Sequence, residues 1–480
     1  MVLEKNSIAK SLVKNSAWLF GAEVFTKLLA LGTQIFAARY LGSKGYGIFS
    51  FSFVAAAITL DFVDYGLRTY LTRELSRRPE DTQILVVNIF IVKWFLTLVT
   101  VVFLFVVYSW LPLDRETLYV LALIAAAMIL NGYSEIYIGV FRAFERMKLV
   151  ASLMVIQRAI FFAIGFLVLV LGGKIIEFST IFLLASILNF ILARSFLKDH
   201  RGKFFANIDR SLARKVFNES KYLCLAILFV WIYFHIDSVL IFFFLGKEET
   251  GLYVAAFKLI ESLALILASI RGALFPAISR EFLANPNELD QIRLNGVRIL
   301  LLITIPISVI TVMLAPQLIQ IIFGSNFEIS ALVLQILAAP FLFLVLNEFI
   351  IYLLLAVNET KSVIKIAITG VIFCVIANCL IIPRLGIMGA AVVAGLTELL
   401  VLILFFRSIK KKYGRTPVFS LIWQPALAAV VMGFFLKQIS WPFIPLILGG
   451  VGVYFIVLLM LRVFNDQDLL VMRNLFNREG

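Results

Sequence analysis

Long apolar stretches joined by short loops constrain this 480-residue chain more than any other feature. A helix needs roughly 20 apolar residues to cross a hydrocarbon core about 30 Å thick. Hydrophobic residues make up 62% of the chain, and a soluble core cannot hide so many long apolar runs. The sequence therefore predicts an all-α polytopic membrane protein with about fourteen transmembrane helices. The predicted spans are 12–38, 46–70, 84–111, 117–142, 150–172, 175–195, 217–245, 250–273, 295–315, 328–357, 362–382, 387–407, 418–436 and 441–462.

The number of Lys and Arg residues alternates between successive loops, and this alternation predicts the orientation. Seven of the 43 cations lie in odd-numbered loops, thirty-two in the termini and the even-numbered loops with their flanks, and four inside spans. Because loops rich in Lys and Arg stay in the cytoplasm, both termini should be cytoplasmic. The formal net charge of +14 is then explained by loops that face anionic lipid headgroups, so we expect no nucleic-acid partner.

The cysteines and the short loops exclude several kinds of site. Cys224, Cys374 and Cys379 fall inside apolar spans and show neither metal-ligand spacing nor a disulfide framework. We therefore expect no metal site and no cofactor. No outer loop is long enough to build an active site, so we do not expect an enzyme. The longest connection, at 196–216, is either an amphipathic helix along the inner leaflet or a solvated linker.

The two halves of the chain resemble each other. YLGSKGYGIFS at 40–50 matches FLGKEETGLYV at 244–254, and later matches follow in the same order at slowly growing offsets. Each repeat holds six spans, so both copies enter the membrane in the same orientation. We therefore expect a pseudo-two-fold axis along the membrane normal, with a cavity between the halves. The predicted organisation is an N-terminal lobe at 1–196, a cytoplasmic linker at 197–216, a C-terminal lobe at 217–410, and two further spans with a cytoplasmic tail at 411–480.

Charged residues inside the spans are the candidate functional groups. An ionisable group in a span costs several kcal/mol unless it faces a partner, the bundle interior or water. Cations that line a hydrated cavity would bind an anion, and phosphate is the obvious candidate. The candidate phosphate-binding residues are Lys27, Lys93, Arg142, Arg158 and Lys258. The candidate carboxylates for ion coupling or gating are Asp61, Asp64, Glu135, Asp237 and Glu348.

An alternative interpretation makes some of these residues local ion pairs with a packing role. Glu23 with Lys27, and Lys258 with Glu261, have the spacing of neighbours on one helix face. Lys93 and Arg158 have no carboxylate three or four residues away, so local pairing does not explain every cation. Asp61 and Asp64 share a face of the second span with Arg68, and two neighbouring carboxylates favour protonation of one of them.

Several segments resemble the Wzx-like polysaccharide flippase branch of the multidrug/oligosaccharidyl-lipid/polysaccharide exporter superfamily. The resemblance rests on AARYLGSKGYGIFSF, HIDSVLIFFFLGKEETGLYVAAFKLIE and IIPRLGIMGAAVVAGLTELL, and it extends from about residue 15 to 410. It implies two six-helix lobes plus a terminal pair, alternating access, and transfer of a polyprenyl-(pyro)phosphate-linked oligosaccharide across the plasma membrane. It also implies a cationic lumen, although Glu23 and the two aspartates make a lumen of mixed sign here. Its expected partners are the lipid-linked oligosaccharide, membrane lipids, H⁺ or Na⁺ as a coupling ion, and a glycan polymerase or ligase.

Three alternatives stay open at this point. A drug or organic-cation antiporter of the same superfamily would favour carboxylates over cations in its cavity. A membrane-embedded glycosyltransferase, ligase or polymerase would need a sizeable outer loop, and the longest candidate (315–328) holds Glu328 as its one charge. A scaffold for an envelope assembly complex would hold a partner enzyme in place without transporting anything.

Overall fold

The computed structural model describes residues 2–196, 208–264, 288–356, 359–413 and 418–463, and nearly all of them are helical. No strand occurs in these ranges. Two short 3₁₀ helices, η1 (Pro79–Asp81) and η3 (Ser325–Phe327), join α-helices. The α-helices are α1 (Val2–Asp64), α2 (Leu67–Arg77), α3 (Thr82–Trp110), α4 (Arg115–Ala143), α5 (Met147–Val170), α6 (Ile175–Ser195), α7 (Arg210–Phe244), α9 (Glu288–Ile322), α10 (Ser330–Ala338), α11 (Phe341–Ala356), α12 (Thr360–Tyr413), α13 (Val418–Gln438) and α14 (Phe443–Met460), with a further helical segment at 247–264.

These helices confirm the predicted membrane architecture. Within the described ranges, nine helices are long and apolar enough to cross a membrane, and α10 with α11 makes a tenth if that pair, bent by 47°, is one span. The long helices α1 and α12 each hold two predicted spans, joined at Gly42 (φ 70°) and Gly386 (φ 62°). Predicted span seven corresponds to the apolar part of α7, Leu228–Phe244. The end of span eight, 265–273, lies outside the described residues.

The second predicted span is wrong at its inner end. The sequence predicts one helix through residue 70, but α1 ends at Asp64 and α2 begins at Leu67. Tyr65 and Gly66 between them have φ values of 50° and 76°, which a continuing right-handed helix cannot adopt. Arg68 is therefore on a separate helix and does not share a face of one straight span with the two aspartates.

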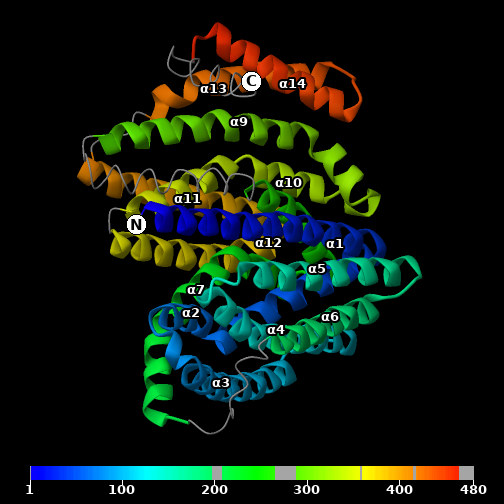
Figure 1. Ribbon diagram of the computed structural model, residues 1–480. Coiled ribbons are helices and arrows are strands. Elements are labelled where there is room, and N and C mark those ends of the chain that lie inside the picture. Colours follow the sequence, from blue (N-terminus) through cyan, green and yellow to red (C-terminus); the bar gives the residue numbers. More distant parts are fainter. Residues whose placement is uncertain (1, 197–207, 265–287, 357–358, 414–417, 464–480) are drawn as a thin grey trace. The chain divides into compact units, whose positions relative to one another are not determined.

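The chain forms two compact units, Met1–Gly251 and Leu252–Gly480. In the first unit α1 packs on α4, α5 and α7, and α4 packs on α6 (Figure 1). In the second unit α9 packs on α10, α11 and α13, and α13 packs on α14. The first unit includes α7 because that helix contacts α1, α2 and α3. The lobes that the sequence predicts, with a division at 197–216, stay a prediction.

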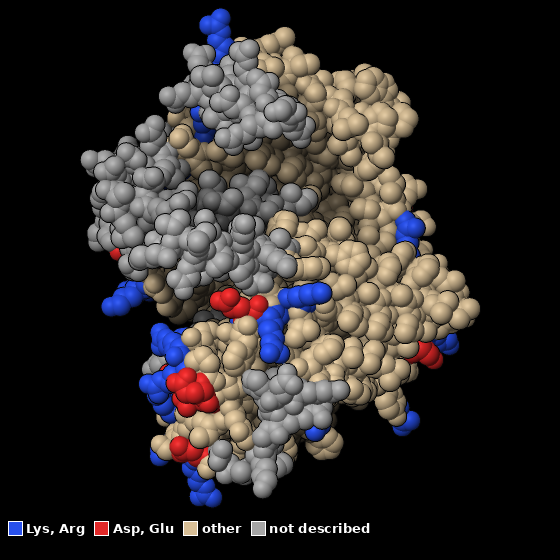
Figure 2. Space-filling model, viewed as in Figure 1, with Lys and Arg blue, Asp and Glu red and all other residues tan. Residues whose placement is uncertain are grey.

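The surface of the first unit separates apolar and charged regions. Apolar side chains on α3 are extensively exposed, among them Trp94, Phe105 and Trp110, as expected of a helix that faces lipid. Charged side chains gather over α2 and the start of α7 (Figure 2). There the Arg73 guanidinium donates to Glu219 Oε2 at 3.0 Å and to Glu74 Oε1 at 3.1 Å.

Equivalent glycines of the two repeats contact each other in the first unit. A Cβ added to Gly47 would overlap the Lys247 carbonyl oxygen and lie 2.9 Å from Gly251 N. A Cβ added to Gly251 would overlap the Ser43 carbonyl oxygen and lie 3.0 Å from Gly47 N. The contact is reciprocal, as a local two-fold relation between the repeats requires. Small residues allow two helix backbones to approach this closely. We call this contact the glycine crossing.

Candidate functional site

A buried ion pair connects the inner end of α1 with α3. The Lys93 ammonium donates to Asp64 Oδ1 at 2.7 Å, and the Lys93 side chain has no exposed surface. Its ammonium also lies 5.9 Å from the ring centroid of Tyr133 on α4, and the Tyr133 hydroxyl is 3.1 Å from Thr97 Oγ1. The glycine at 132 leaves room for this arrangement, because a Cβ there would lie 3.3 Å from Lys93 Cε. Charge pairing and aromatic contact together offset the desolvation of this lysine.

A second, looser pair lies beside the first. The Arg68 guanidinium on α2 is 3.4 Å from Glu135 Oε2 on α4, and both side chains keep part of their surface exposed. The break at Tyr65 and Gly66 brings α2 against α4, since the two helices pack together after it. Two of the predicted carboxylates therefore pair with a cation of a neighbouring helix: Asp64 with Lys93, and Glu135 with Arg68.

Asp61 lies one turn before Asp64 on α1 and differs from it. Its Oδ2 atom is buried and has no hydrogen-bond partner among the described residues. Its backbone carbonyl faces Cys224 Sγ at 3.9 Å. A buried carboxylate oxygen without a partner is costly in its charged form. The surroundings of Asp61 thus favour a bound proton or cation.

The remaining candidate cations have unlike surroundings. Lys258 donates to Glu261 Oε2 at 2.6 Å, so the local-pair interpretation holds for these two residues. Lys27 is exposed and is not within ion-pair distance of Glu23, so that local pair is not formed. Arg142 and Arg158 are half-buried, and neither has a carboxylate within ion-pair distance among the described residues.

Lys27 and Arg158 lie at similar depth on two parallel helices. Trp18 on α1 contacts Lys148 on α5 at 5.9 Å, and Phe36 contacts Phe162 at 5.5 Å. Residues of α1 and α5 that contact each other are thus about 126 to 130 positions apart in the sequence. By this offset, the part of α5 at the level of Lys27 is within about one turn of Arg158. Lys27 is nine residues from Phe36, about two and a half turns, so it is on the opposite face of α1. The two cations share a depth and a helix pair, but not a face.

Asp237 and Glu348 lie apart from this cluster in the chain. Asp237 is buried on α7, and its Oδ1 accepts from Ser238 N at 2.8 Å. Glu348 is half-buried on α11 of the second unit, next to Asn347, whose amide donates to Glu398 Oε2 at 2.7 Å. No group of three His, Cys, Asp or Glu side chains in the described ranges is arranged to hold a metal ion.

Sequence reasoning missed a neutral polar network among α4, α5 and α6. The Gln157 amide donates to Asn131 Oδ1 at 2.6 Å and lies 3.3 Å from Ser186 Oγ. Gln157 directly precedes Arg158, so this network fixes the helix turn that carries the guanidinium. Polar residues inside three consecutive apolar spans are the signal from which it was predictable.

The chain is similar to proteins whose names describe glycan transport. The family described as polysaccharide biosynthesis protein matches residues 12–282. The probable low-salt glycan biosynthesis flippase Agl15 of Haloferax volcanii is 27% identical over 88% of this chain and 90% of that protein. The putative O-antigen transporter of Escherichia coli (strain K12) is 24% identical over 84% of this chain and 99% of that protein.

Solved structures share the fold. The lipid II flippase MurJ in an inward closed conformation has a TM-score of 0.76 at 16% identity, over 92% of this chain and 98% of that one. An inward-facing multidrug resistance MATE family transporter of the MOP superfamily has a TM-score of 0.64 at 13% identity, over 82% and 95%. At these identities the likeness concerns the fold alone.

Proposed function

Because the chain belongs to the polysaccharide biosynthesis protein family, we propose that it is a flippase for a lipid-linked oligosaccharide. It moves the glycan headgroup from the cytoplasmic to the outer leaflet by alternating access. The observation that carries the proposal is the match to the Haloferax volcanii flippase over 90% of that protein's length. The Lys and Arg distribution supports a position in the plasma membrane with both termini in the cytoplasm. Transport without bond chemistry on the glycan fits the short outer loops.

Lys27 and Arg158 are the first candidates for binding the cargo's phosphate. An unpaired cation at membrane depth is stable only where water or an anion reaches it. Lys27 is exposed and Arg158 has no carboxylate partner among the described residues, whereas Lys93 and Lys258 are already paired. In this proposal Lys93 holds α3 against α1, and it binds cargo only if a conformational change separates it from Asp64. Arg142 stays a secondary candidate.

Asp61 is the candidate for coupling transport to protons. A proton on its buried Oδ2 would remove the uncompensated charge, and the neighbouring Lys93–Asp64 pair would respond to that change. One elementary charge moved across the membrane potential is worth about 2.3 kcal/mol per 100 mV, which is enough to bias a transport cycle. Na⁺ is the alternative coupling ion, and it requires further oxygen ligands.

The test is a flipping assay in proteoliposomes. A short-chain polyprenyl-pyrophosphate oligosaccharide is placed in both leaflets, and the fraction accessible to an added lectin is followed with and without a proton gradient. We expect Lys27→Gln and Arg158→Gln to slow flipping, and Asp61→Asn to remove its dependence on the gradient. Lys437→Gln, at an exposed cation in the last turn of α13, is the control and should flip normally.

Two results would contradict the proposal. If the wild-type protein leaves the glycan lipid unflipped but exports cationic dyes, the antiporter alternative is correct. If Lys27→Gln, Arg158→Gln and the double variant all flip at the wild-type rate, these cations do not bind the cargo. A gradient of Na⁺ that replaces the proton gradient would refute proton coupling through Asp61.

A further inference from the structure

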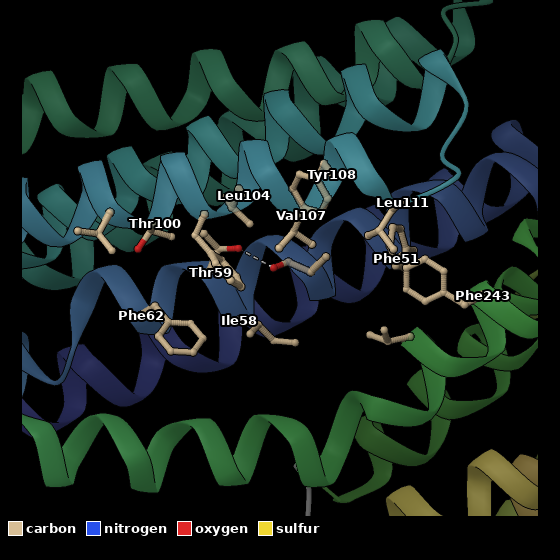
Figure 3. Close-up of a pocket in the computed structure, with 14 residues that line it drawn as sticks. Phe51, Ile58, Thr59, Phe62, Thr100, Leu104, Val107, Tyr108, Leu111 and Phe243 are labelled. Carbon is tan, nitrogen blue, oxygen red and sulfur yellow. Dashed lines mark hydrogen bonds between the residues drawn. The ribbon is translucent and has the colours of Figure 1, made fainter.

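A pocket of about 530 Å³ lies in the first unit between the second half of α1, the outer half of α3 and the end of α7 (Figure 3). It is separate from the ion pairs, and none of the predicted site residues lines it. Phe51 and Phe62 mark its two ends on α1, Leu104 and Tyr108 line it from α3, and Phe243 lines it from α7.

The lining is suited to a hydrocarbon ligand. Apart from the hydroxyls of Thr59, Thr100 and Tyr108, every lining side chain is aliphatic or aromatic. Thr59 Oγ1 donates to the Ala55 carbonyl within its own helix at 2.9 Å, and the Tyr108 hydroxyl interacts with Thr59. A buried water needs two to four polar partners, and a polar ligand needs a few convergent polar groups. The pocket offers no charged group, and two of its three hydroxyls are already engaged, so its natural occupant is largely apolar.

The length of the pocket matches one leaflet of a bilayer. Phe51 and Phe62 are eleven residues apart on one helix, which corresponds to about 16 Å. Half of a hydrocarbon core about 30 Å thick is close to this length. Leu111 and Phe243 line the pocket near the ends of α3 and α7, the ends that the Lys and Arg distribution places on the outer side. The pocket therefore runs from the outer interface to the bilayer centre.

The pocket opens onto the lipid-facing surface of α3. Its lining residues Val99 and Phe103 remain 49% and 59% exposed. Val102 and Val106, which do not line the pocket, continue this exposed apolar face along the same helix. A lipid chain can thus enter sideways from the bilayer without passing a charged group.

We propose that this pocket binds one hydrocarbon chain of an outer-leaflet membrane lipid, held between α1, α3 and α7. A membrane lipid is favoured over the cargo's tail because the pocket, about 16 Å long, matches one acyl chain within a single leaflet, whereas a polyprenyl tail is much longer. The Lys247 ammonium at the α7 end is 2.5 Å from Asp114 Oδ1 and is neutralised by it. The bound chain would join α7, which belongs to the second repeat in sequence, to α1 and α3 of the first. The inference does not depend on the proposed function.

Photolabelling tests the proposal directly. The protein is reconstituted in phosphatidylcholine vesicles that contain phosphatidylcholine with a diazirine at the end of one acyl chain. Mass spectrometry should find the label on the peptides that carry Phe62 and Val99, at the floor of the pocket. Ala55→Leu and Ile58→Trp both fill the pocket and should lose most of this label. Leu98→Trp, at a position of α3 that is exposed but does not line the pocket, should keep it.

A thermal shift gives an independent readout. Adding phosphatidylcholine to the delipidated protein should raise the Tm of the wild-type protein and of Leu98→Trp, because ligand binding stabilises the folded state. Ala55→Leu should lose that rise while it remains folded. Label spread evenly along the exposed face of α3, unchanged in the filled variants, would overturn the proposal. So would labelling by a polyprenyl-phosphate probe that phosphatidylcholine does not displace, because that result assigns the pocket to the cargo's tail.

Discussion

The glycine crossing predicts a sharp effect of adding one methyl group. Gly47→Ala places a Cβ against backbone atoms of Lys247 and Gly251, so no side-chain rotation can relieve the overlap. Overpacking of this kind costs about 1–3 kcal/mol, and the better helix propensity of alanine returns about 1 kcal/mol at most. We expect a net loss of about 1–2 kcal/mol, or a Tm lower by about 2–4 °C for a unit of this size. Gly251→Ala should act in the same direction, since its Cβ meets the Ser43 carbonyl oxygen.

The matched control is Gly21→Ala on the same helix. A Cβ there has no atom within 4 Å, so its Tm should stay equal or rise slightly. Because Gly47 and Gly251 meet in one contact, the double alanine variant should lose less than the sum of the single losses.

Cross-linking reports whether the backbones separate. Ser43 Oγ lies 3.3 Å from Glu248 Oε1 across the crossing. In a background without the three native cysteines, a Ser43→Cys/Glu248→Cys pair should form a disulfide on oxidation. Gly47→Ala should reduce its yield. If Gly47→Ala and Gly251→Ala match Gly21→Ala in both Tm and cross-linking, the close approach described here is refuted.

Three further predictions concern the charged residues. Lys93→Met should destabilise the protein by about 3–5 kcal/mol because it leaves Asp64 buried and unpaired, and adding Asp64→Leu should restore most of that loss in chemical unfolding. Burial alone would raise the pKa of Asp114, but hydrogen bonds from Lys247 and Thr117 outweigh it and hold the pKa below its usual range. The resulting stabilisation, about 1 kcal/mol or less for an exposed pair, is present above the unfolded-state pKa near 4 and is lost as pH falls through the folded pKa. Tm measured against pH should show this decline in the wild-type protein but not in Asp114→Asn. Arg158→Gln should slow flipping while the Tm stays near that of the wild-type protein.

The sequence predicted the spans because each depends on a local property. An apolar run long enough to cross the bilayer forms a helix whatever its neighbours are, since its backbone groups must be satisfied within the segment. The offset of 204 between the repeats likewise predicted that Gly47 and Gly251 are equivalent, and both lie in the glycine crossing. The break at Tyr65 and Gly66 was missed because Asp61, Asp64 and Arg68 were interpreted as one polar face of a continuous helix, although Gly66 lies between them.

Contacts between helices were beyond the sequence, and this explains the errors at the site. The partner of Lys93 is Asp64, twenty-nine positions away on another helix, so a search three or four residues along the chain could not find it. The pocket between α1, α3 and α7 depends on side chains of three helices that are far apart in sequence. Helical periodicity predicts which face a residue occupies, but not which residue of a neighbouring helix it meets.

The ion pairs also decide which of the predicted cations deserve a functional role. A cation that is paired with its own carboxylate is nearly neutral as a pair, and binding an anion there would first require breaking the pair. A cation at membrane depth without such a carboxylate keeps its full charge, which is costly unless water or an anionic ligand compensates it. Lys93 and Lys258 are of the first kind, and Lys27 and Arg158 are of the second among the described residues. Arg142 also has no carboxylate within ion-pair distance in the described ranges, but it lies in the last turn of α4, at a helix end. The five predicted cations, which composition and spacing could not distinguish, thus differ in the energetic cost of their charge. We assign cargo binding to the two at membrane depth for which the protein itself supplies no counter-charge.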